Sequence, residues 1–245
     1  MRVHVVHANN RALYRDEIEA MHRHRYQVFV LERGWRALES PDGLDIDEFD
    51  NDDATYLVGI DNDGRVAGSG RFIPSWRPNL LKTLFPEYCL NGVPVGPGIW
   101  EWTRHATPGR SRSKEENLKF QILMNLAVLE FAQTRGITCF IGMLETSLLP
   151  HTIDLGWKSL PIGAPHAYGE GVAVAIQSEV RRGHLQQLRA RAGINDAILV
   201  EVPGFVGQRG RIVREWLELA SRLSEPDLRC AADTFAACFA QRAIS

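Results

Sequence analysis

Cysteine is scarce in this chain of 245 residues, and no two cysteines lie close together. The four cysteines, Cys89, Cys139, Cys230 and Cys238, form no CxxC pair. Their spacing predicts reduced thiols in a cytoplasmic protein rather than a disulfide framework or a zinc site. Long apolar runs are also missing, since none approaches the roughly 20 residues that cross a bilayer. We therefore expect no association with a membrane.

An excess of charge of either sign is absent too. The chain carries 28 Lys and Arg against 30 Asp and Glu, which gives a formal net charge of -2. This balance gives no reason to expect nucleic acid as a partner. The eight histidines form neither an HExxH motif nor any paired ligand spacing, so the sequence predicts no metal site.

What the chain does contain is enough apolar material for a full core, at 44% hydrophobic residues. We assign residues 1–195 to a main domain and residues 196–245 to a helical C-terminal extension packed on it.

Apolar patterning predicts strands at 3–6, 55–60, 66–72, 99–106, 138–143, 157–160 and, as the last strand, 172–178. Near-helical spacing predicts helices at 11–29, 117–133 and 147–155, in the residues leading up to 192, and at 211–223 and 226–242. Residues 35–53 and 76–97 are expected to be loops.

The order of these elements predicts an α+β fold. An antiparallel run of strands followed by strand–helix–strand makes a three-layer α-β-α sandwich around a central mixed sheet. The helix at 117–133 joins strands 99–106 and 138–143, which makes those two strands a parallel pair in the middle of the sheet. Where such strands diverge, a V-shaped cleft can hold a ligand that pairs with backbone groups. This is the layout of the acetyltransferase-like (GNAT-type) fold.

Charged residues of both signs interrupt the apolar segments between residues 25 and 104. Ions among core residues are costly to desolvate unless they pair with each other or with a ligand. A ligand that itself bears both signs would suit such a site. The residues concerned are Arg25, Arg71, Arg104, Asp47, Asp50 and Glu101.

Glu101 is the first candidate for catalysis. Alternation along the strand places Glu101 and Thr103 on one face, and Trp100, Trp102 and Arg104 on the other. Glu101 is therefore expected to point away from bulk water, where desolvation raises a carboxyl pKa and suits a general base. A structural salt bridge to an arginine is an equally open alternative.

The other candidates each allow two interpretations. The acidic run at 45–53 is either a solvated loop or part of a ligand site, and it lacks the glycine and glutamate positions of a calcium loop. Trp35 is either a core residue or an aromatic surface for a purine or a sulfonium. Arg71 is flanked by glycines that permit close backbone approach. It either clamps a carboxylate with both arms or pairs with Asp47 or Asp50.

Taken together, these residues resemble the signature of the LuxI-type acyl-homoserine-lactone synthases. The resemblance rests on order, residue type and approximate spacing, in Arg25-x3-Phe29-x5-Trp35, Asp47-Glu48-Phe49-Asp50, Arg71, Phe85 and Glu101-x2-Arg104. A later segment, Gly156-Trp157 followed by Pro161-Ile162-Gly163-x-Pro165, is also similar. The similarity covers residues 1–179, and the tail beyond residue 196 matches no part of the family pattern.

The resemblance implies a two-step reaction on S-adenosylmethionine. The amine attacks an acyl thioester to form an amide, and the carboxylate then displaces methylthioadenosine and closes a homoserine lactone. It makes Glu101 the base, with Thr103 and Arg104 beside it, and it implies substrates but no cofactor. The S-adenosylmethionine pocket is expected to comprise Arg25, Phe29, Trp35, Asp47, Asp50, Arg71, Phe85 and Arg104. The acyl pocket is expected to comprise Trp102, Phe140, Met143, Leu144 and Leu148.

The acyl donor is either acyl-coenzyme A or an acyl carrier protein. The loop at 107–114 has just one glycine and lacks the pyrophosphate-binding pattern of acetyltransferases. Its cations, Arg110, Arg112 and Lys114, suit either the phosphates of coenzyme A or an acidic carrier protein. The paired tryptophans 100 and 102 resemble the branch that accepts acyl-coenzyme A, which we slightly favour. The alternative functions are an N-acyltransferase with a different amine acceptor and a non-catalytic, ligand-binding descendant.

Overall fold

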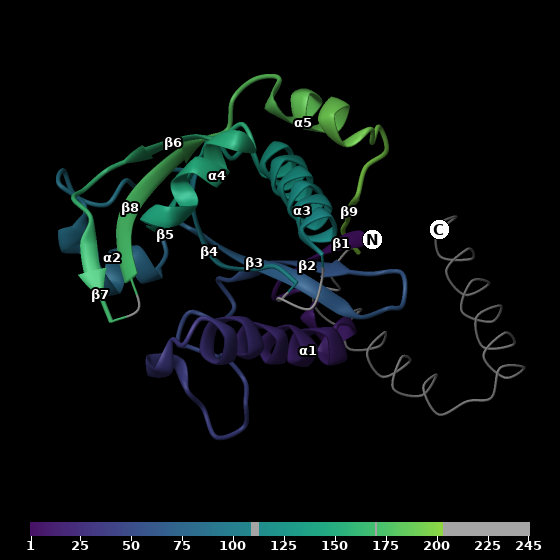
Figure 1. The fold of residues 1–245 in the computed structure, drawn as a ribbon, viewed down its shortest axis with the longest axis horizontal. Helices are drawn as coiled ribbons and strands as arrows, with labels where there is room; N and C mark the ends of the chain where they lie inside the picture. Colours follow the sequence, from purple (N-terminus) through teal and green to yellow (C-terminus); the bar gives the residue numbers. More distant parts are fainter. Residues whose placement is uncertain (109–112, 170, 203–245) are drawn as a thin grey trace, which may run out of the picture. The chain divides into compact units, whose positions relative to one another are not determined.

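The computed structural model describes residues 1–108, 113–169 and 171–202 (Figure 1). The helices predicted at 211–223 and 226–242 lie outside the described residues. The strands are β1 (Arg2–Val6), β2 (Thr55–Ile60), β3 (Val66–Pro74), β4 (Ile99–Ala106), β5 (Cys139–Glu145), β6 (Lys158–Pro161), β7 (His166–Tyr168), β8 (Gly171–Glu179) and β9 (Leu199–Val200). The α-helices are α1 (Arg15–Tyr26), α2 (Leu80–Leu84), α3 (Lys114–Arg135), α4 (Leu149–Asp154) and α5 (His184–Ala192).

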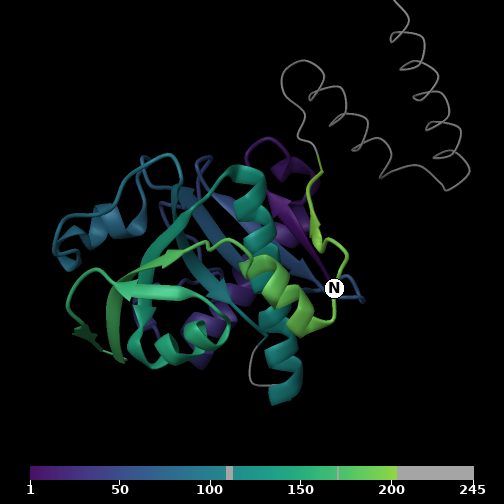
Figure 2. The ribbon, with the colours of Figure 1, turned by 90° about the horizontal axis from the view of Figure 1, so that it is seen from above.

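One mixed sheet runs through the described part of the chain. Its order is β6-β8-β5-β4-β3-β2-β1-β9, and β7 also pairs with β8. Helix α1 covers one face of the sheet and α3 the other (Figure 1). Figure 2 shows α5 lying beside α3 on that second face. The predicted α+β fold, a three-layer sandwich, is confirmed.

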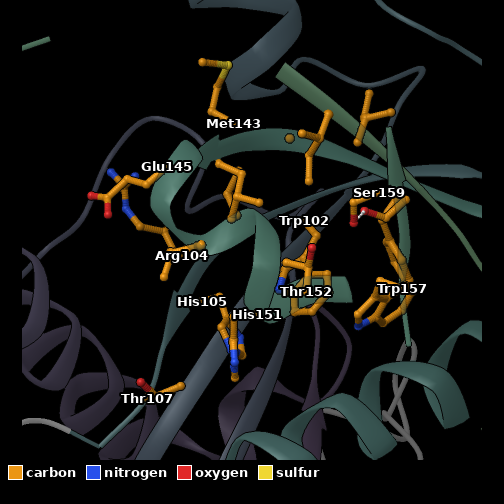
Figure 3. A pocket seen from close by; sticks show the side chains of 18 of the residues that line it. Trp102, Arg104, His105, Thr107, Met143, Glu145, His151, Thr152, Trp157 and Ser159 are labelled. Carbon is orange, nitrogen blue, oxygen red and sulfur yellow. Dashed lines mark hydrogen bonds between the residues drawn. The ribbon is translucent and has the colours of Figure 1, made fainter. Parts of the chain in front are cut away.

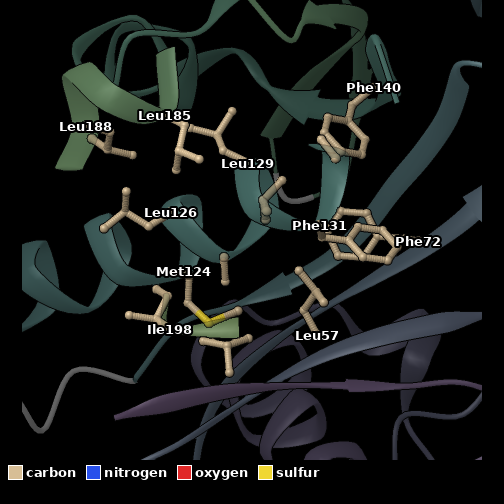
Figure 4. Close-up of a cluster of buried hydrophobic side chains, with 14 of the residues drawn as sticks. Leu57, Phe72, Met124, Leu126, Leu129, Phe131, Phe140, Leu185, Leu188 and Ile198 are labelled. Atoms are coloured by element: carbon tan, nitrogen blue, oxygen red, sulfur yellow. The ribbon is translucent and has the colours of Figure 1, made fainter. Parts of the chain in front are cut away.

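The period-two pattern of the strands divides the core between the two faces. In β2, Leu57 belongs to the large apolar cluster under α3, whereas its neighbour Tyr56 packs with Met21 of α1 on the opposite face. Under α3, the ring of Phe72 lies 5.3 Å from that of Phe131 and 5.6 Å from that of Phe140 (Figure 4). Burial on both faces holds β2, β3 and β4 rigidly in the centre of the molecule.

The cleft predicted between the two central parallel strands is present. β4 and β5 pair only from Ile99 with Cys139 to Glu101 with Ile141. Beyond that point β4 continues along β3, and β5 continues along β8 to Glu145. Gly142 stands where the strands diverge, and a Cβ atom there would lie 2.7 Å from the carbonyl oxygen of Trp102. The missing side chain therefore lets the two backbones approach closely at the base of the cleft.

Four details differ from the sequence-based expectations. The helix predicted at 11–29 divides into a 3-10 turn (Arg11–Leu13), α1, and a π-helical segment at Gln27–Glu32. The wider π turn, with Arg33 N donating to Val28 O at 3.1 Å, leaves no mark in the apolar spacing. The expected loop at 76–97 contains the short helix α2. Two short strands, β7 and β9, were not predicted, so 172–178 is not the last strand.

Residues 196–202, from the segment that we assigned to the C-terminal extension, include β9. It pairs in parallel with β1, with Val3 opposite Leu199 and His4 opposite Val200. Among the helices of the described residues, none combines the length and the apolar character that a membrane span needs.

Candidate active site

Three arginines and three aspartates form a closed ring of ion pairs beside the cleft. The ring runs in the order Asp45, Arg25, Asp50, Arg71, Asp47 and Arg104, and closes on Asp45. Each guanidinium bridges two carboxylates, and each carboxylate bridges two guanidinium groups. Apart from the short Arg71–Asp47 contact, the N–O distances lie between 2.8 and 3.1 Å. We call this cluster the ionic ring.

The ionic ring gathers distant parts of the chain and is closed to solvent except at one edge. Arg25 comes from α1, Arg71 from β3 and Arg104 from β4, while the aspartates come from the loop before β2. The side chain of Asp47 is 14% exposed and that of Arg104 is 8% exposed, whereas the other four are at most 2% exposed. The alternative of a solvated acidic loop is therefore wrong for Asp45 and Asp50.

The ionic ring shifts the pKa values of its members. Burial alone would raise the pKa of Asp50, but the charges and hydrogen bonds of Arg25, together with the charge of Arg71, outweigh it. The pKa of Asp50 consequently lies well below its ordinary value, and the carboxylate stays ionised. Tyr56 adds a further donor, since its hydroxyl donates to Asp50 Oδ1 at 3.0 Å. The sequence left two alternatives for Arg71, which were to clamp a carboxylate or to pair with Asp47 or Asp50. In the structure Arg71 pairs with both of these aspartates.

Arg104 lies on a different face of β4 from the one that alternation predicts. It has a φ of 51°, in the left-handed region that non-glycine residues seldom adopt. The register with β3 shifts there, because Arg71 lies opposite Thr103 and Ser69 lies opposite Ala106. This β-bulge turns Arg104 into the ionic ring, where it bonds Asp45 and Asp47. A left-handed residue held by two ion pairs is typical of a functional site.

Glu101 is fully buried on the same side of the sheet as Arg71. Its carboxylate accepts hydrogen bonds from the backbone N–H groups of Leu80, at 3.1 Å, and Leu81, at 2.6 Å. These donors are the free N–H groups at the start of α2, where a negative charge is favourable. Burial nevertheless outweighs the two hydrogen bonds and raises the pKa of Glu101 above its ordinary value. The hydrogen-bond partners of Glu101 in the structure are thus two backbone amides. The alternative expectation, a salt bridge between Glu101 and an arginine, does not describe these contacts.

Thr103 contacts the ionic ring. It lies two residues after Glu101 along β4, and its hydroxyl oxygen accepts a hydrogen bond from Arg71 Nε at 3.2 Å. Arg71 and Glu101 lie on the same side of the sheet, so the contact between Thr103 and Arg71 agrees with the prediction that Thr103 and Glu101 share a face.

Two aromatic rings stack beside the ionic ring. Phe29, from the π-helical segment, and Trp35 have centroids 5.0 Å apart and planes within 11° of parallel. The Arg33 guanidinium lies 5.7 Å from the Phe29 ring and 5.8 Å from the Trp35 ring, and that of Arg104 lies 5.9 Å from Phe29. Such faces attract cations. The stack therefore offers a second surface for a positively charged group.

A pocket of about 240 Å³ opens where β4 and β5 diverge (Figure 3). Phe29, Trp35, Thr103 and Arg104 line it on the side of the ionic ring. The predicted acyl-pocket residues all line it as well, namely Trp102, Phe140, Met143, Leu144 and Leu148. Arg104 therefore belongs both to the ionic ring and to the pocket wall, and it joins the two halves of the site.

Some predicted site residues lie elsewhere. Phe85 follows α2 and stacks on Tyr88 at 5.4 Å, outside the lining of this pocket. Arg110, Arg112 and the side chain of Lys114 lie outside the described residues. In the described part of the chain, no three His, Cys, Asp or Glu side chains gather as a metal site would require.

Sequence reasoning missed several residues of the site. Asp45 was not singled out, although it stands two residues before Asp47 in the same acidic run. Arg33, Glu145 and Tyr168 were also missed. Arg33 and Glu145 line the pocket, the Tyr168 hydroxyl donates to Glu145 at 2.7 Å, and Arg33 lies 3.7 Å from the same carboxylate. No local pattern marks these three, because their strands and loops are far apart in sequence.

A three-layer sandwich whose central parallel strands diverge over a pocket defines an acetyltransferase-like protein. The sequence model described as autoinducer synthase matches residues 9–188. The chain therefore belongs to the autoinducer synthase family of acyltransferases.

Individual relatives agree with this assignment. The chain is 32% identical over 202 residues to the isovaleryl-homoserine lactone synthase of Bradyrhizobium diazoefficiens, which covers 82% of this chain and 90% of the relative. It is 34% identical over 165 residues to the acyl-homoserine-lactone synthase of Ralstonia nicotianae, covering 66% of this chain and 81% of the relative.

Solved structures share the fold over most of their length. The coenzyme A-dependent acyl-homoserine lactone synthase BjaI, solved with S-adenosylmethionine and isopentyl-coenzyme A, has a TM-score of 0.76 at 31% identity, covering 88% of this chain and 99% of BjaI. MesI, also described as coenzyme A-dependent, has a TM-score of 0.72 at 32% identity, covering 81% of this chain and 99% of MesI.

Proposed function

We propose that this protein synthesises an N-acyl-L-homoserine lactone from S-adenosylmethionine and an acyl thioester. The amine nitrogen of S-adenosylmethionine attacks the thioester carbonyl, an amide bond forms, and the thiol leaves. A carboxylate oxygen of the same molecule then attacks its γ-carbon and breaks the bond to the sulfonium sulfur. Methylthioadenosine leaves, and the lactone ring is closed. The reaction uses two substrates and no cofactor.

The observation that carries this proposal is the junction at Arg104. S-adenosylmethionine presents an ammonium, a carboxylate and a sulfonium, so its site must offer both signs of charge and a surface for a cation. The ionic ring has its exposed edge at Asp47 and Arg104, and the Phe29–Trp35 stack lies next to Arg104. The apolar pocket begins at the same arginine. Arg104 therefore lies where the charged acceptor, S-adenosylmethionine, and the acyl group would come together.

Glu101 acts in this scheme as the base that receives the proton of the attacking amine, through a water molecule. Its raised pKa supports this role, because a base works best when its pKa approaches the working pH. The two backbone N–H groups hold its carboxylate in one orientation, which favours catalysis by positioning. Arg71 Nε orients Thr103 toward the same region.

Acyl-coenzyme A is the donor that we favour over acyl carrier protein. The support is the likeness to BjaI and MesI together with the tryptophans 100 and 102 of β4. The buried thiols of Cys89 and Cys139 are free, which supports the proposed cytoplasmic location.

The proposal is tested by incubating the full chain with S-adenosylmethionine and a series of acyl-coenzyme A and acyl-carrier thioesters. We expect mass spectrometry to detect an acyl-homoserine lactone and methylthioadenosine in equal amounts. Acylation of another amine, with S-adenosylmethionine left intact, would instead establish an N-acyltransferase with a different acceptor. Binding without turnover of any thioester would establish a non-catalytic protein.

A further inference from the structure

The pocket wall contains polar groups of two kinds. Most have partners within the protein. Asn125 Oδ1 accepts from Trp157 Nε1 at 2.7 Å, the hydroxyls of Ser159 and Ser178 lie 2.8 Å apart, and the Thr152 hydroxyl donates to the Leu149 carbonyl at 2.9 Å. A hydrocarbon chain could lie against these groups without loss of a hydrogen bond.

Three other buried polar atoms of the same wall have no hydrogen-bond partner among the described residues. They are His105 Nδ1, Gln121 Oε1 and His151 Nε2, and we call these three residues the polar wall. The indole nitrogen of Trp102, which also lines the pocket, has no hydrogen-bond partner among the described residues either. His105 and His151 lie beside each other (Figure 3) and interact electrostatically. Buried polar atoms without partners are destabilising, so they point to a ligand that completes them.

The donor and acceptor properties of the polar wall specify the chemistry of that ligand. In the orientation that the structure gives Gln121, its Oε1 accepts hydrogen bonds and calls for a ligand that donates one. Burial, with further contributions from Arg33 and His151, lowers the pKa of His105 to about 4, so its imidazole is neutral near pH 7. A neutral imidazole has one N–H donor and one acceptor nitrogen. A hydroxyl both donates and accepts, whereas a ketone lacks the donor and an alkyl group lacks both.

We propose that the preferred acyl group of this enzyme carries a hydroxyl that binds the polar wall of His105, Gln121 and His151. This inference rests on the proposed function and adds the class of its acyl substrate. The rest of the group is hydrocarbon or aromatic, because Phe140, Met143 and Leu148 line the same pocket. A fully hydrocarbon acyl group would fill the pocket but displace water from three polar atoms without replacing its hydrogen bonds.

The test uses the full chain, S-adenosylmethionine and pairs of acyl-coenzyme A thioesters that differ by one hydroxyl. The pairs place that hydroxyl at the 3-position of an aliphatic chain, at the end of such a chain, and on an aromatic ring. We expect the hydroxylated member of at least one pair to have a kcat/KM about tenfold higher than its parent. A parent that matches or exceeds its hydroxylated partner in every pair would overturn this inference alone. Failure of every one of these thioesters, and of the acyl-carrier thioesters as well, to give a lactone would overturn the proposed function too.

Variants assign the preference to the polar wall. Gln121→Met and His151→Phe keep the approximate size of the side chain and remove its polar atom. In each we expect the ratio of the two kcat/KM values, hydroxylated substrate over parent, to fall toward one. Thr152→Val is the matched control, because its hydroxyl already bonds Leu149, and it should keep the preference. A preference that survives both polar-wall variants would overturn the assignment to these residues, and thermal unfolding checks that each variant is folded.

Discussion

The ionic ring, through Arg104, and the polar wall both border one pocket, and they differ in how their polar groups are satisfied. In the ring, each charged group pairs with two of opposite sign from the same chain. In the wall, three buried polar atoms have no partner among the described residues. The ring is complete without a ligand, whereas the wall is the part that we propose a substrate completes.

A preformed ring benefits an enzyme whose acceptor is highly charged. Fixed dipoles and charges that already point in the right direction need no rearrangement during the reaction. The ring also carries no net charge, with three arginines against three aspartates, so its burial does not leave an isolated ion. The wall instead contributes selectivity, because a substrate that cannot pair with it leaves polar atoms unsatisfied.

The largest expected effect is at Glu101, which, like the ring, already has partners within the chain. We predict that Glu101→Gln reduces kcat by roughly 100- to 10,000-fold, the usual range for a positioned general base. The base must be ionised to act, and its pKa is raised by burial. The rate of the wild-type enzyme should therefore rise with pH through a value above the ordinary 4.5, and this limb should be missing in the variant.

A control separates catalysis from support of α2. Asn79 caps the same helix, because its Oδ1 accepts from the backbone N–H of Lys82 at 3.0 Å. Asn79→Ala should lower stability by about 1 kcal/mol and leave most of the activity. Equal losses of activity in the Asn79 and Glu101 variants would mean that Glu101 acts only by holding α2 in place.

The next effect concerns the stability of the ring. We predict that Arg25→Met lowers the free energy of unfolding by about 3–5 kcal/mol, because Asp45 and Asp50 each lose a buried partner. Arg23→Met, on the same helix, removes an exposed ion pair with Glu19 and should cost at most about 1 kcal/mol. Urea unfolding of both variants measures the difference. Similar costs for the two would show that the ring contributes no more than a surface ion pair.

The sequence predicted most of this arrangement but not its details. Strand alternation and the 117–133 helix were sufficient for the α+β sandwich and its divergent parallel strands, because those patterns are local. Alternation failed at Arg104, since a bulge with a positive φ depends on how β3 and β4 pair. The order of ion pairs in the ring and the place of Asp45 in it depend on tertiary contacts among α1, β3, β4 and the loop before β2. A single sequence contains no local signal for such contacts.

The ring also predicts a dependence of stability on pH. The pKa of Asp50 is lower in the folded protein than its ordinary value of 3.8, so folding favours the ionised form. Its contribution to stability is complete well above pH 3.8 and is lost as the pH falls through that value toward the lower folded-state pKa. Each unit of pKa depression corresponds to about 1.4 kcal/mol.

Unfolding measurements from neutral pH down to about pH 3 check this dependence. The stability difference between wild type and Asp50→Asn should shrink as the pH falls, because protonation removes the advantage of the carboxylate. Asp52→Asn serves as the control, since Asp52 has an 89% exposed side chain and pairs only loosely with Arg11 at 3.5 Å. A difference between wild type and Asp50→Asn that stays constant across this range would exclude the coupling.

The smallest expected effect concerns Arg33, which lines the pocket and lies against the aromatic stack. Its guanidinium is 5.7 Å from the Phe29 ring and 5.8 Å from the Trp35 ring, at a distance where cation–π attraction contributes about 0.5–1 kcal/mol. Arg33→Met should therefore raise the KM for S-adenosylmethionine about two- to fivefold through looser positioning of the stack, with little change in kcat. Arg36→Met, whose side chain is 84% exposed and pairs with Glu39, should leave both constants unchanged. A lower KM in the Arg33 variant would mean that the arginine competes with the sulfonium for the aromatic faces, which would make it a gate rather than a support.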